Sequence, residues 1–187
     1  MMNIFLKEVC NELHQMDIDF IIVGGSAIES EGYDIGTADL DFVLAPKKFD
    51  KVQKQLEKNS KFRVRDRIKT MIESEFMFEN TWQTVEFIDP AYFSGKKTPD
   101  DFIDYIKRYR SRKKEIGYVA KPEVVFYMRL MITDWEIYIQ KILRDIRAGL
   151  PEETLDEVIE ISKTLGVDDK MEPRVNKTKQ IIDSRLN

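Results

Sequence analysis

The sequence predicts an α/β fold, in which a mixed sheet of about four or five strands is flanked by helices and followed by a C-terminal helical bundle. Two observations support this. Up to about residue 90, short apolar runs such as FIIV at 20–23 alternate with amphipathic helical patterns. Beyond residue 118 the apolar residues recur every three or four positions, which is typical of helices packed on one another. We therefore expect two domains, residues 1–118 and residues 119–187.

Composition excludes several classes of protein. A net charge of −4 argues against a general nucleic-acid-binding protein, which would usually be basic. The single cysteine, Cys10, cannot form an internal disulfide and fits a reducing compartment. No signal peptide is visible, and no apolar run approaches the length of a membrane span. We expect a cytoplasmic protein that does not contact membranes.

The first elements are predicted around a glycine turn. Residues 2–16 have the spacing of an amphipathic helix, and the apolar strand at 20–23 follows. Gly24 and Gly25 then allow a tight turn with accessible backbone N–H groups. The positive end of the short helix expected after this turn would favour an anion such as a phosphate.

Two aspartates follow in the next predicted strand. Asp39 and Asp41 are two residues apart, so an extended chain would place their carboxylates on one face, about 7 Å apart. Such carboxylates repel each other unless a cation lies between them, and oxygen ligands suit Mg²⁺. A phosphate-binding turn beside a Mg²⁺ site is typical of phosphoryl or nucleotidyl transfer.

The middle of the chain adds a helix, strands and two basic stretches. Residues 47–58 are predicted to form a helix, and residues 61–69 a strand in which five cations alternate with apolar residues. These cations are interpreted either as the solvated side of an edge strand or as a positive wall for a triphosphate or RNA. Residues 76–78 and 84–88 are further short strands. Residues 99–114 are predicted to be a helix with a basic C-terminal end. These cations are interpreted either as residues that the helix dipole favours at that end or as a binding site for an RNA end.

The last third is predicted to be helical. One long helix is expected from residue 122 to residue 148, followed by two shorter ones near residues 155–165 and 177–186. On the long helix, Lys141 is interpreted either as a phosphate-binding residue or as the partner of Asp145 in a surface pair four residues apart.

A family resemblance joins these features. Gly24-Gly25-Ser26 after a strand, with Thr37-Ala38-Asp39-Leu40-Asp41 in the next, resembles the DNA polymerase β-like nucleotidyltransferase superfamily. The likeness is to its small members among abortive-infection and toxin–antitoxin proteins, where Arg-x-Thr often precedes Asp-x-Asp; Ile35 stands here in place of that arginine. The resemblance implies a nucleotidyltransferase fold, a catalytic domain within residues 1–118 and a third carboxylate on a later strand. Glu86 between apolar neighbours fits that position better than Asp89, which precedes a proline.

The resemblance also implies a reaction. A nucleoside monophosphate would pass from a nucleoside triphosphate to a hydroxyl of an RNA or tRNA end, a protein or a small molecule. Two Mg²⁺ or Mn²⁺ ions would bind Asp39 and Asp41, and Glu86 would bind one of them and help deprotonate the acceptor. The phosphates would be bound by Gly24, Gly25, Ser26, Thr37 and Lys141. A toxin or antitoxin partner is implied as well.

Two other functions stay open from the sequence. One is a non-catalytic relative that binds a nucleotide or a partner protein through the same fold. The other is an RNA-binding module that uses the two basic stretches, 61–69 and 107–114.

Overall fold

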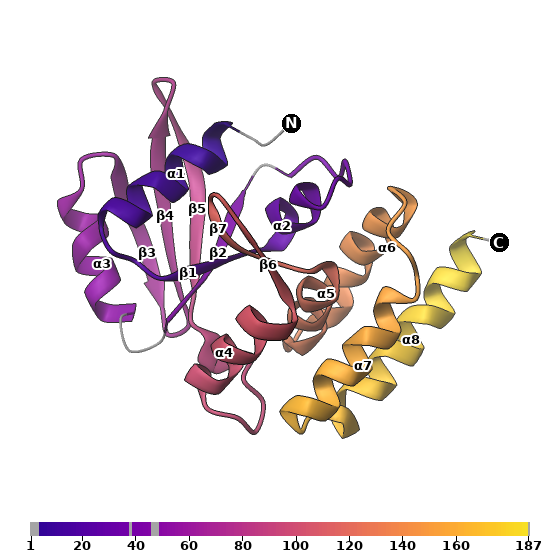
Figure 1. Cartoon of the computed structure of the whole chain (residues 1–187). Coiled ribbons are helices and arrows are strands. Elements are labelled where there is room, and N and C mark those ends of the chain that lie inside the picture. Colours follow the sequence, from indigo (N-terminus) through magenta and orange to yellow (C-terminus); the bar gives the residue numbers. More distant parts are fainter. Residues whose placement is uncertain (1–3, 38, 46–48, 187) are drawn as a thin grey trace.

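A computed structural model describes residues 4–37, 39–45 and 49–186 of the chain. Within these residues the chain forms eight α-helices, two short 3₁₀ helices and a sheet of seven strands (Figure 1). In chain order they are α1 (Ile4–Gln15), β1 (Phe20–Val23), α2 (Gly24–Ser30), β2 (Leu40–Leu44), α3 (Phe49–Lys58), β3 (Phe62–Ile68), β4 (Met71–Phe78), β5 (Thr81–Ile88), η2 (Pro90–Tyr92), α4 (Pro99–Tyr109), β6 (Ser111–Lys114), β7 (Gly117–Ala120), α5 (Pro122–Met131), η3 (Trp135–Tyr138), α6 (Ile139–Arg147), α7 (Thr154–Leu165) and α8 (Asp168–Leu186).

The sheet is mixed, as predicted, and its strand order is β3-β4-β5-β2-β1-β7-β6. β2 runs antiparallel to β1 and parallel to β5, with Asp41 opposite Glu86. β7 is parallel to β1 and belongs to the same sheet. Because β7 runs from Gly117 to Ala120, it spans the domain boundary predicted between residues 118 and 119. The α/β class with a helical C-terminal part is therefore confirmed, although the described sheet has more strands than the four or five predicted.

One face of the sheet carries aromatic side chains and is covered by α1 and α3 (Figure 1). Phe42 of β2 contacts Phe20 of β1 and Phe87 of β5, with ring centroids 5.3 and 5.6 Å apart. Phe5 of α1 continues this series onto Phe76 of β4. Because alternate residues of a strand point to opposite faces, these buried rings direct Asp41 and Glu86 to the other face.

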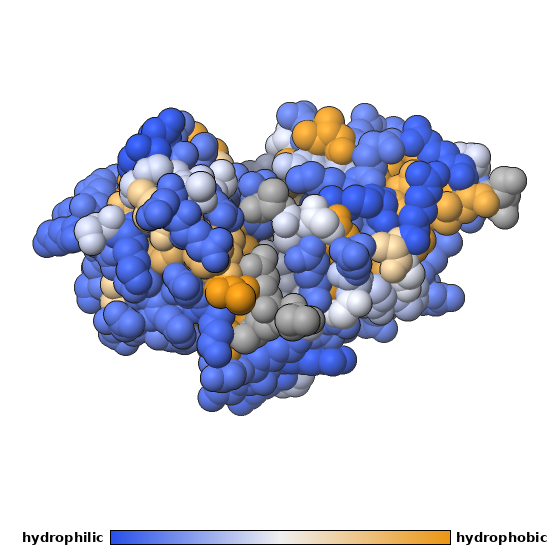
Figure 2. Space-filling model, turned by 90° about the horizontal axis from the view of Figure 1, so that it is seen from above, coloured by the Kyte–Doolittle hydropathy of each residue, from blue (hydrophilic) through white to orange (hydrophobic). Residues whose placement is uncertain are grey.

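That other face is partly covered by helices. α2 packs between β2 and α5, and α7 packs between α5 and α8, so the C-terminal helices lie on the same side of the sheet as α2 (Figure 1). Seen from above, hydrophilic residues cover most of the surface, and its outline is indented between the part that carries β3–β5 and the part that carries the C-terminal helices (Figure 2). In the part of the chain that the structure describes, no helix has both the length and the apolar character of a membrane span.

The helix predicted for residues 99–114 is wrong in its last five residues. α4 ends at Tyr109, and residues 111–114 form strand β6, which pairs only with β7 at the edge of the described sheet. Every residue of β6 is polar or charged, so neither strand periodicity nor an apolar face identified it. Its cations are locally paired: Arg112 and Lys114 both contact Glu31, at 3.0 and 3.3 Å.

The single long helix predicted for residues 122–148 is also wrong. α5 ends at Met131 because Ile132 is extended, and the chain resumes helical geometry only at η3 and α6. α8 satisfies the free carbonyls at this break: Arg174 donates to those of Leu130 and Ile132, and Lys170 to that of Met131. The apolar spacing continues across the break, so the sequence pattern does not reveal it.

The basic strand β3 does not present five cations on one face. A bulge between Val64 and Asp66 shifts the register. Arg63 contacts Glu75 of β4, whereas Arg67 reaches the opposite face and pairs with Asp50 of α3. The interpretation as an edge strand is confirmed, because β3 ends the described sheet.

Candidate active site

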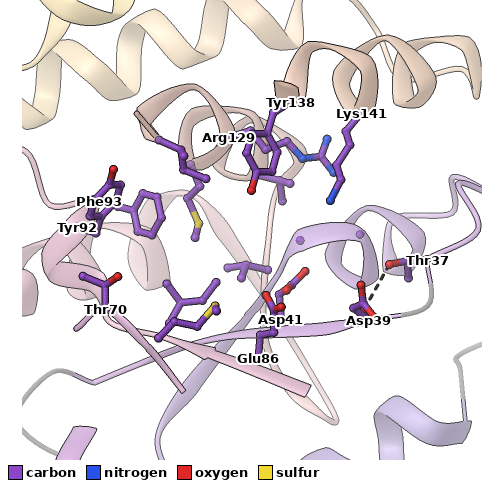
Figure 3. Close-up of a pocket in the computed structure, with 18 of the residues that line it drawn as sticks. Thr37, Asp39, Asp41, Thr70, Glu86, Tyr92, Phe93, Arg129, Tyr138 and Lys141 are labelled. Atoms are coloured by element: carbon purple, nitrogen blue, oxygen red, sulfur yellow. Dashed lines mark hydrogen bonds between the residues drawn. The ribbon is translucent and has the colours of Figure 1, made fainter. Parts of the chain in front are cut away.

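A cavity of about 710 Å³ lies between the open face of the sheet and the helices α5 and α6. Figure 3 shows Asp41 and Glu86 side by side on the sheet, with Arg129, Tyr138 and Lys141 facing them from the helices. Of the residues predicted to form the site, those that line this cavity are Gly24, Gly25, Thr37, Asp39, Asp41, Glu86 and Lys141. The fold therefore brings residues from β1–α2, β2, β5 and α6 to one place.

Asp41 and Glu86 form a coupled pair of carboxyl groups. They are neighbours on the parallel strands β2 and β5, and both are half-buried. Burial raises the pKa of both groups, and burial together with the neighbouring carboxylates, Asp41 foremost, raises the pKa of Glu86 to about 7. Asp39 and Glu73, the neighbour of Glu86 on β4, raise the pKa of Glu86 in the same direction. Such repulsion between buried acids is relieved by a proton or by a cation.

The glycine turn packs directly against the acids. Gly24 has φ +63°, and a Cβ atom at this position would lie 1.8 Å from Oδ2 of Asp41. A Cβ atom on Gly25 would lie 2.4 Å from Oγ1 of Thr37. Both positions therefore require glycine, because Asp41 and Thr37 occupy the space that a side chain would need.

The third predicted acid, Asp39, stands apart from the other two. β2 begins at Leu40, so Asp39 lies just before the strand and is not held by its alternation. Figure 3 shows Asp39 beside Thr37, and the charge of Asp39 still raises the pKa of both Asp41 and Glu86. The Ser26 and Thr37 hydroxyls both donate to the Asp39 carbonyl, each at 3.3 Å. Ser26 is buried and is not among the cavity-lining residues, so its hydroxyl positions the loop before β2.

Three cations face the acids across the cavity. Arg129 of α5 and Arg144 of α6 both form ion pairs with Asp145, which is completely buried. The distance from Arg144 to Asp145 is 2.9 Å. The interpretation of Lys141 and Asp145 as a surface pair is therefore wrong, because Asp145 points inward to the two arginines. Lys141 is exposed at the cavity, and its ammonium lies 5.3 Å from the Tyr138 ring centroid. The charges of Arg129 and Lys141 act to lower the pKa of Asp41, against the effect of burial.

The sequence placed Arg129 and Arg144 next to Lys141 on the expected long helix, but neither arginine was given a role in the predicted site. Arg129 is the only charged residue in the apolar run VVFYMRLM of α5, and a buried charge implies a partner or a function. That signal was available, although its partner Asp145 lies sixteen positions away across the break between α5 and α6. The apolar residues that line the rest of the cavity come from several separate elements and carry no shared sequence signal.

The donor set fits a divalent cation bound together with a substrate. Among the residues described, no three His, Cys, Asp or Glu side chains gather into a metal-binding group. Asp41 and Glu86 nevertheless provide two adjacent carboxylates whose repulsion a cation would relieve. Mg²⁺ commonly takes one or two carboxylates and completes its shell with water and phosphate oxygens.

Comparisons with known proteins give neighbours in structure alone. No protein-family model matches the chain, and no curated protein sequence is significantly similar to it. Three similar solved structures are a candidate nucleotidyltransferase of Thermotoga maritima, an antigenic nucleotidyltransferase-like protein of Paracoccidioides brasiliensis and ANT(2'')-Ia in complex with adenylyl-2''-tobramycin. They are 14, 16 and 12% identical to this chain, each with a TM-score of 0.44. The matches cover 74, 89 and 98% of this chain and 90, 91 and 97% of those proteins.

Two of these three neighbours are named as a nucleotidyltransferase or a nucleotidyltransferase-like protein. At this identity and TM-score, neither residue roles nor substrates are carried over from them. The function is argued below from the cavity.

Proposed function

We propose that the chain is a nucleotidyltransferase that moves a nucleoside monophosphate from a nucleoside triphosphate to an acceptor hydroxyl. The observation that carries this is the opposition, within one cavity, of the Asp41–Glu86 pair and the three cations Arg129, Lys141 and Arg144. Cations on one wall suit a polyphosphate, and paired carboxyl groups on the other suit a divalent ion and a general base.

Each group then has a role. The N–H groups of the turn at Gly24 and Gly25, with Lys141 and Arg144, bind the β- and γ-phosphates. Asp41 and Glu86 would hold one divalent ion together with phosphate oxygens, and Asp39 a second. When bound, Mg²⁺ or Mn²⁺ supplies charge stabilisation to the attacking and leaving oxygens of an in-line displacement.

The proton and the leaving group are both accounted for. The acceptor oxygen forms a bond to the α-phosphorus, and the bond from that phosphorus to its bridging oxygen breaks. Pyrophosphate leaves with the bonding electron pair toward Lys141 and Arg144. The proton of the acceptor hydroxyl passes to the carboxylate of Glu86, which lies opposite Asp41 at the reaction centre.

The experiment combines each α-labelled nucleoside triphosphate with Mg²⁺ or Mn²⁺ and with total cellular RNA, protein or small molecules. Asp41→Asn and Glu86→Gln are each expected to reduce transfer by more than about 100-fold. Glu79→Gln, at the exposed turn between β4 and β5, is the matched control and should transfer normally. Full transfer by Asp41→Asn would refute the mechanism. The toxin–antitoxin setting implied by the resemblance stays a prediction.

A further inference from the structure

The end of the cavity remote from the glycine turn is apolar. β4 and β5 contribute Met71 and Ile88, which are paired in register, and Ile68 of β3 pairs with the same Met71. Directly after β5, η2 brings Tyr92 and then Phe93 to this end. Figure 3 shows Tyr92 and Phe93 on the far side of Asp41 and Glu86 from Thr37 and Lys141. We call this set the apolar end; it comprises Ile68, Met71, Ile88, Tyr92, Phe93, Met128 and Ile132.

Part of this apolar surface is exposed. Ile68 is 51% exposed and Tyr92 is 38% exposed, and both line the same end of the cavity. The Tyr92 hydroxyl forms a hydrogen bond with Oγ1 of Thr133, at 3.1 Å, which holds the ring in place. An exposed apolar wall beside a polar reaction centre is typical of a binding surface for an uncharged group.

The charges of the cavity disfavour a polycationic occupant of this end. Among the described residues that line the cavity, the only acids are the three of the reaction centre, Asp39, Asp41 and Glu86. An amine-rich ligand at the apolar end would therefore have no carboxylate to pair with other than those of the reaction centre, and it would lie near the cation Arg129. An uncharged ring loses little hydration there and gains contact with Phe93 and Tyr92.

The geometry of an in-line displacement indicates which of the two reactants binds at the apolar end. The attacking and leaving oxygens lie on opposite sides of the phosphorus in such a displacement. Pyrophosphate leaves toward Lys141 and Arg144, so the attacking hydroxyl enters from the opposite side, past Glu86. That side is the apolar end.

We infer that the acceptor is an uncharged alcohol that carries an apolar or aromatic ring, and that the apolar end binds this ring. The inference rests on the proposed function and adds the chemical class of the acceptor to it. The ring lies against Phe93 and Ile88, which directs the hydroxyl to Glu86 and the α-phosphorus. Thr70, whose side chain also lines this end, offers a hydroxyl to a polar substituent of the acceptor.

The test uses 2-(2-naphthyl)ethanol as the probe, an uncharged and fluorescent ring-bearing alcohol. Its binding is measured by fluorescence in the presence of a non-hydrolysable nucleoside triphosphate, and its labelling is measured with an α-labelled one. The variant is Ile68→Asn/Tyr92→Asn, which adds no charge near the acids. The control is Ile4→Asn/Tyr109→Asn, which replaces two hydrophobic residues of similar exposure, 67 and 58%, away from the cavity.

The probe is expected to bind the wild type and to become labelled. The cavity variant should weaken probe binding about tenfold, because it removes apolar contact area, while its nucleotide Kd changes less than about twofold. The control variant should leave both constants unchanged, and the melting temperatures of both variants verify that they fold.

Three results would overturn the inference. One is equal probe binding by the cavity variant and the control. Another is displacement of the nucleotide by the probe, which would assign the apolar end to the nucleobase. The last is faster labelling of the polycation tobramycin than of the probe. Failure of the proposed function looks different: no nucleotide would bind and no pyrophosphate would be released, with water as acceptor or with any alcohol.

Discussion

The contact between Gly24 and Asp41 gives the sharpest prediction, for the substitution Gly24→Ala. At φ +63° an alanine costs about 1–2 kcal/mol relative to glycine. The new Cβ atom would also lie 1.8 Å from Oδ2 of Asp41, so that carboxylate must leave its position. Forcing a side chain off its rotamer adds about 1 kcal/mol. We expect a total loss of about 2–3 kcal/mol in the free energy of unfolding, or roughly 4–12 °C in Tm.

The effect on activity should be larger than the effect on stability. A displacement of about 1 Å in a group that aligns the reaction can cost about 100-fold in rate, so transfer by Gly24→Ala should fall at least that far. Gly36→Ala is the matched control, because Gly36 has φ +61° and its Cβ atom would meet no atom of the described residues within 4 Å. It should lose only the backbone contribution, about 1–2 kcal/mol, and retain activity.

Urea unfolding and the labelled transfer assay measure the two quantities on both variants. Equal losses of stability and activity in Gly24→Ala and Gly36→Ala would show that the clash with Asp41 has no consequence. The reasoning from the close approach would then be refuted, since the two positions share a positive φ and only Gly24 has the contact with Asp41.

Three further predictions concern buried groups. In metal-free protein, Glu86 keeps a proton in the folded state up to pH about 7 but loses it near pH 4.5 when unfolded, so Tm should fall as pH rises through that window. Glu86→Gln should flatten this fall, which is measured from melting curves recorded with a chelator at pH 5 and 8. A Glu86→Gln protein with the same difference in Tm between the two pH values as the wild type would contradict the prediction. Asp145→Asn leaves the buried Arg129 without its charged partner and should cost about 3–5 kcal/mol in urea unfolding, against less than about 1 kcal/mol for Arg144→Gln. Burial raises the pKa of the Cys10 thiol to about 12, so a thiol reagent at pH 8 should modify it only after unfolding, and rapid modification of the native protein would show that the site opens.

The sequence predicted those parts of the fold in which local pattern and tertiary environment agree. The run FIIV is apolar throughout because β1 is central and buried on both faces. In β2, Asp41 is the one polar residue among buried apolar ones, because it faces the cavity. Glu86 was found for the same reason, as a charge between two residues that point into the aromatic core.

Where an element depends on distant residues, the local pattern was misleading. The break after α5 is stabilised by Arg174 and Lys170 of α8, about forty residues further along the chain. The edge strand β6 has no apolar side chain, since only its backbone is bound to the sheet. The bulge in β3 likewise depends on the register of β4, so alternation alone wrongly predicted one basic face.

The same distinction explains why the acids were easier to predict than the rest of the site. A carboxylate inside a strand stands out because it opposes the apolar pattern, and two strands in register bring Asp41 and Glu86 together without help from other elements. Asp39 precedes β2, so its side chain follows the loop of Thr37 and not the strand. The cations depend on Asp145, which holds Arg129 and Arg144 across two helices that the sequence pattern joins into one. Loss of Asp145 should therefore weaken nucleotide binding even though Asp145 itself is fully buried, and a nucleotide Kd unchanged in a folded Asp145→Asn protein would contradict this positioning role.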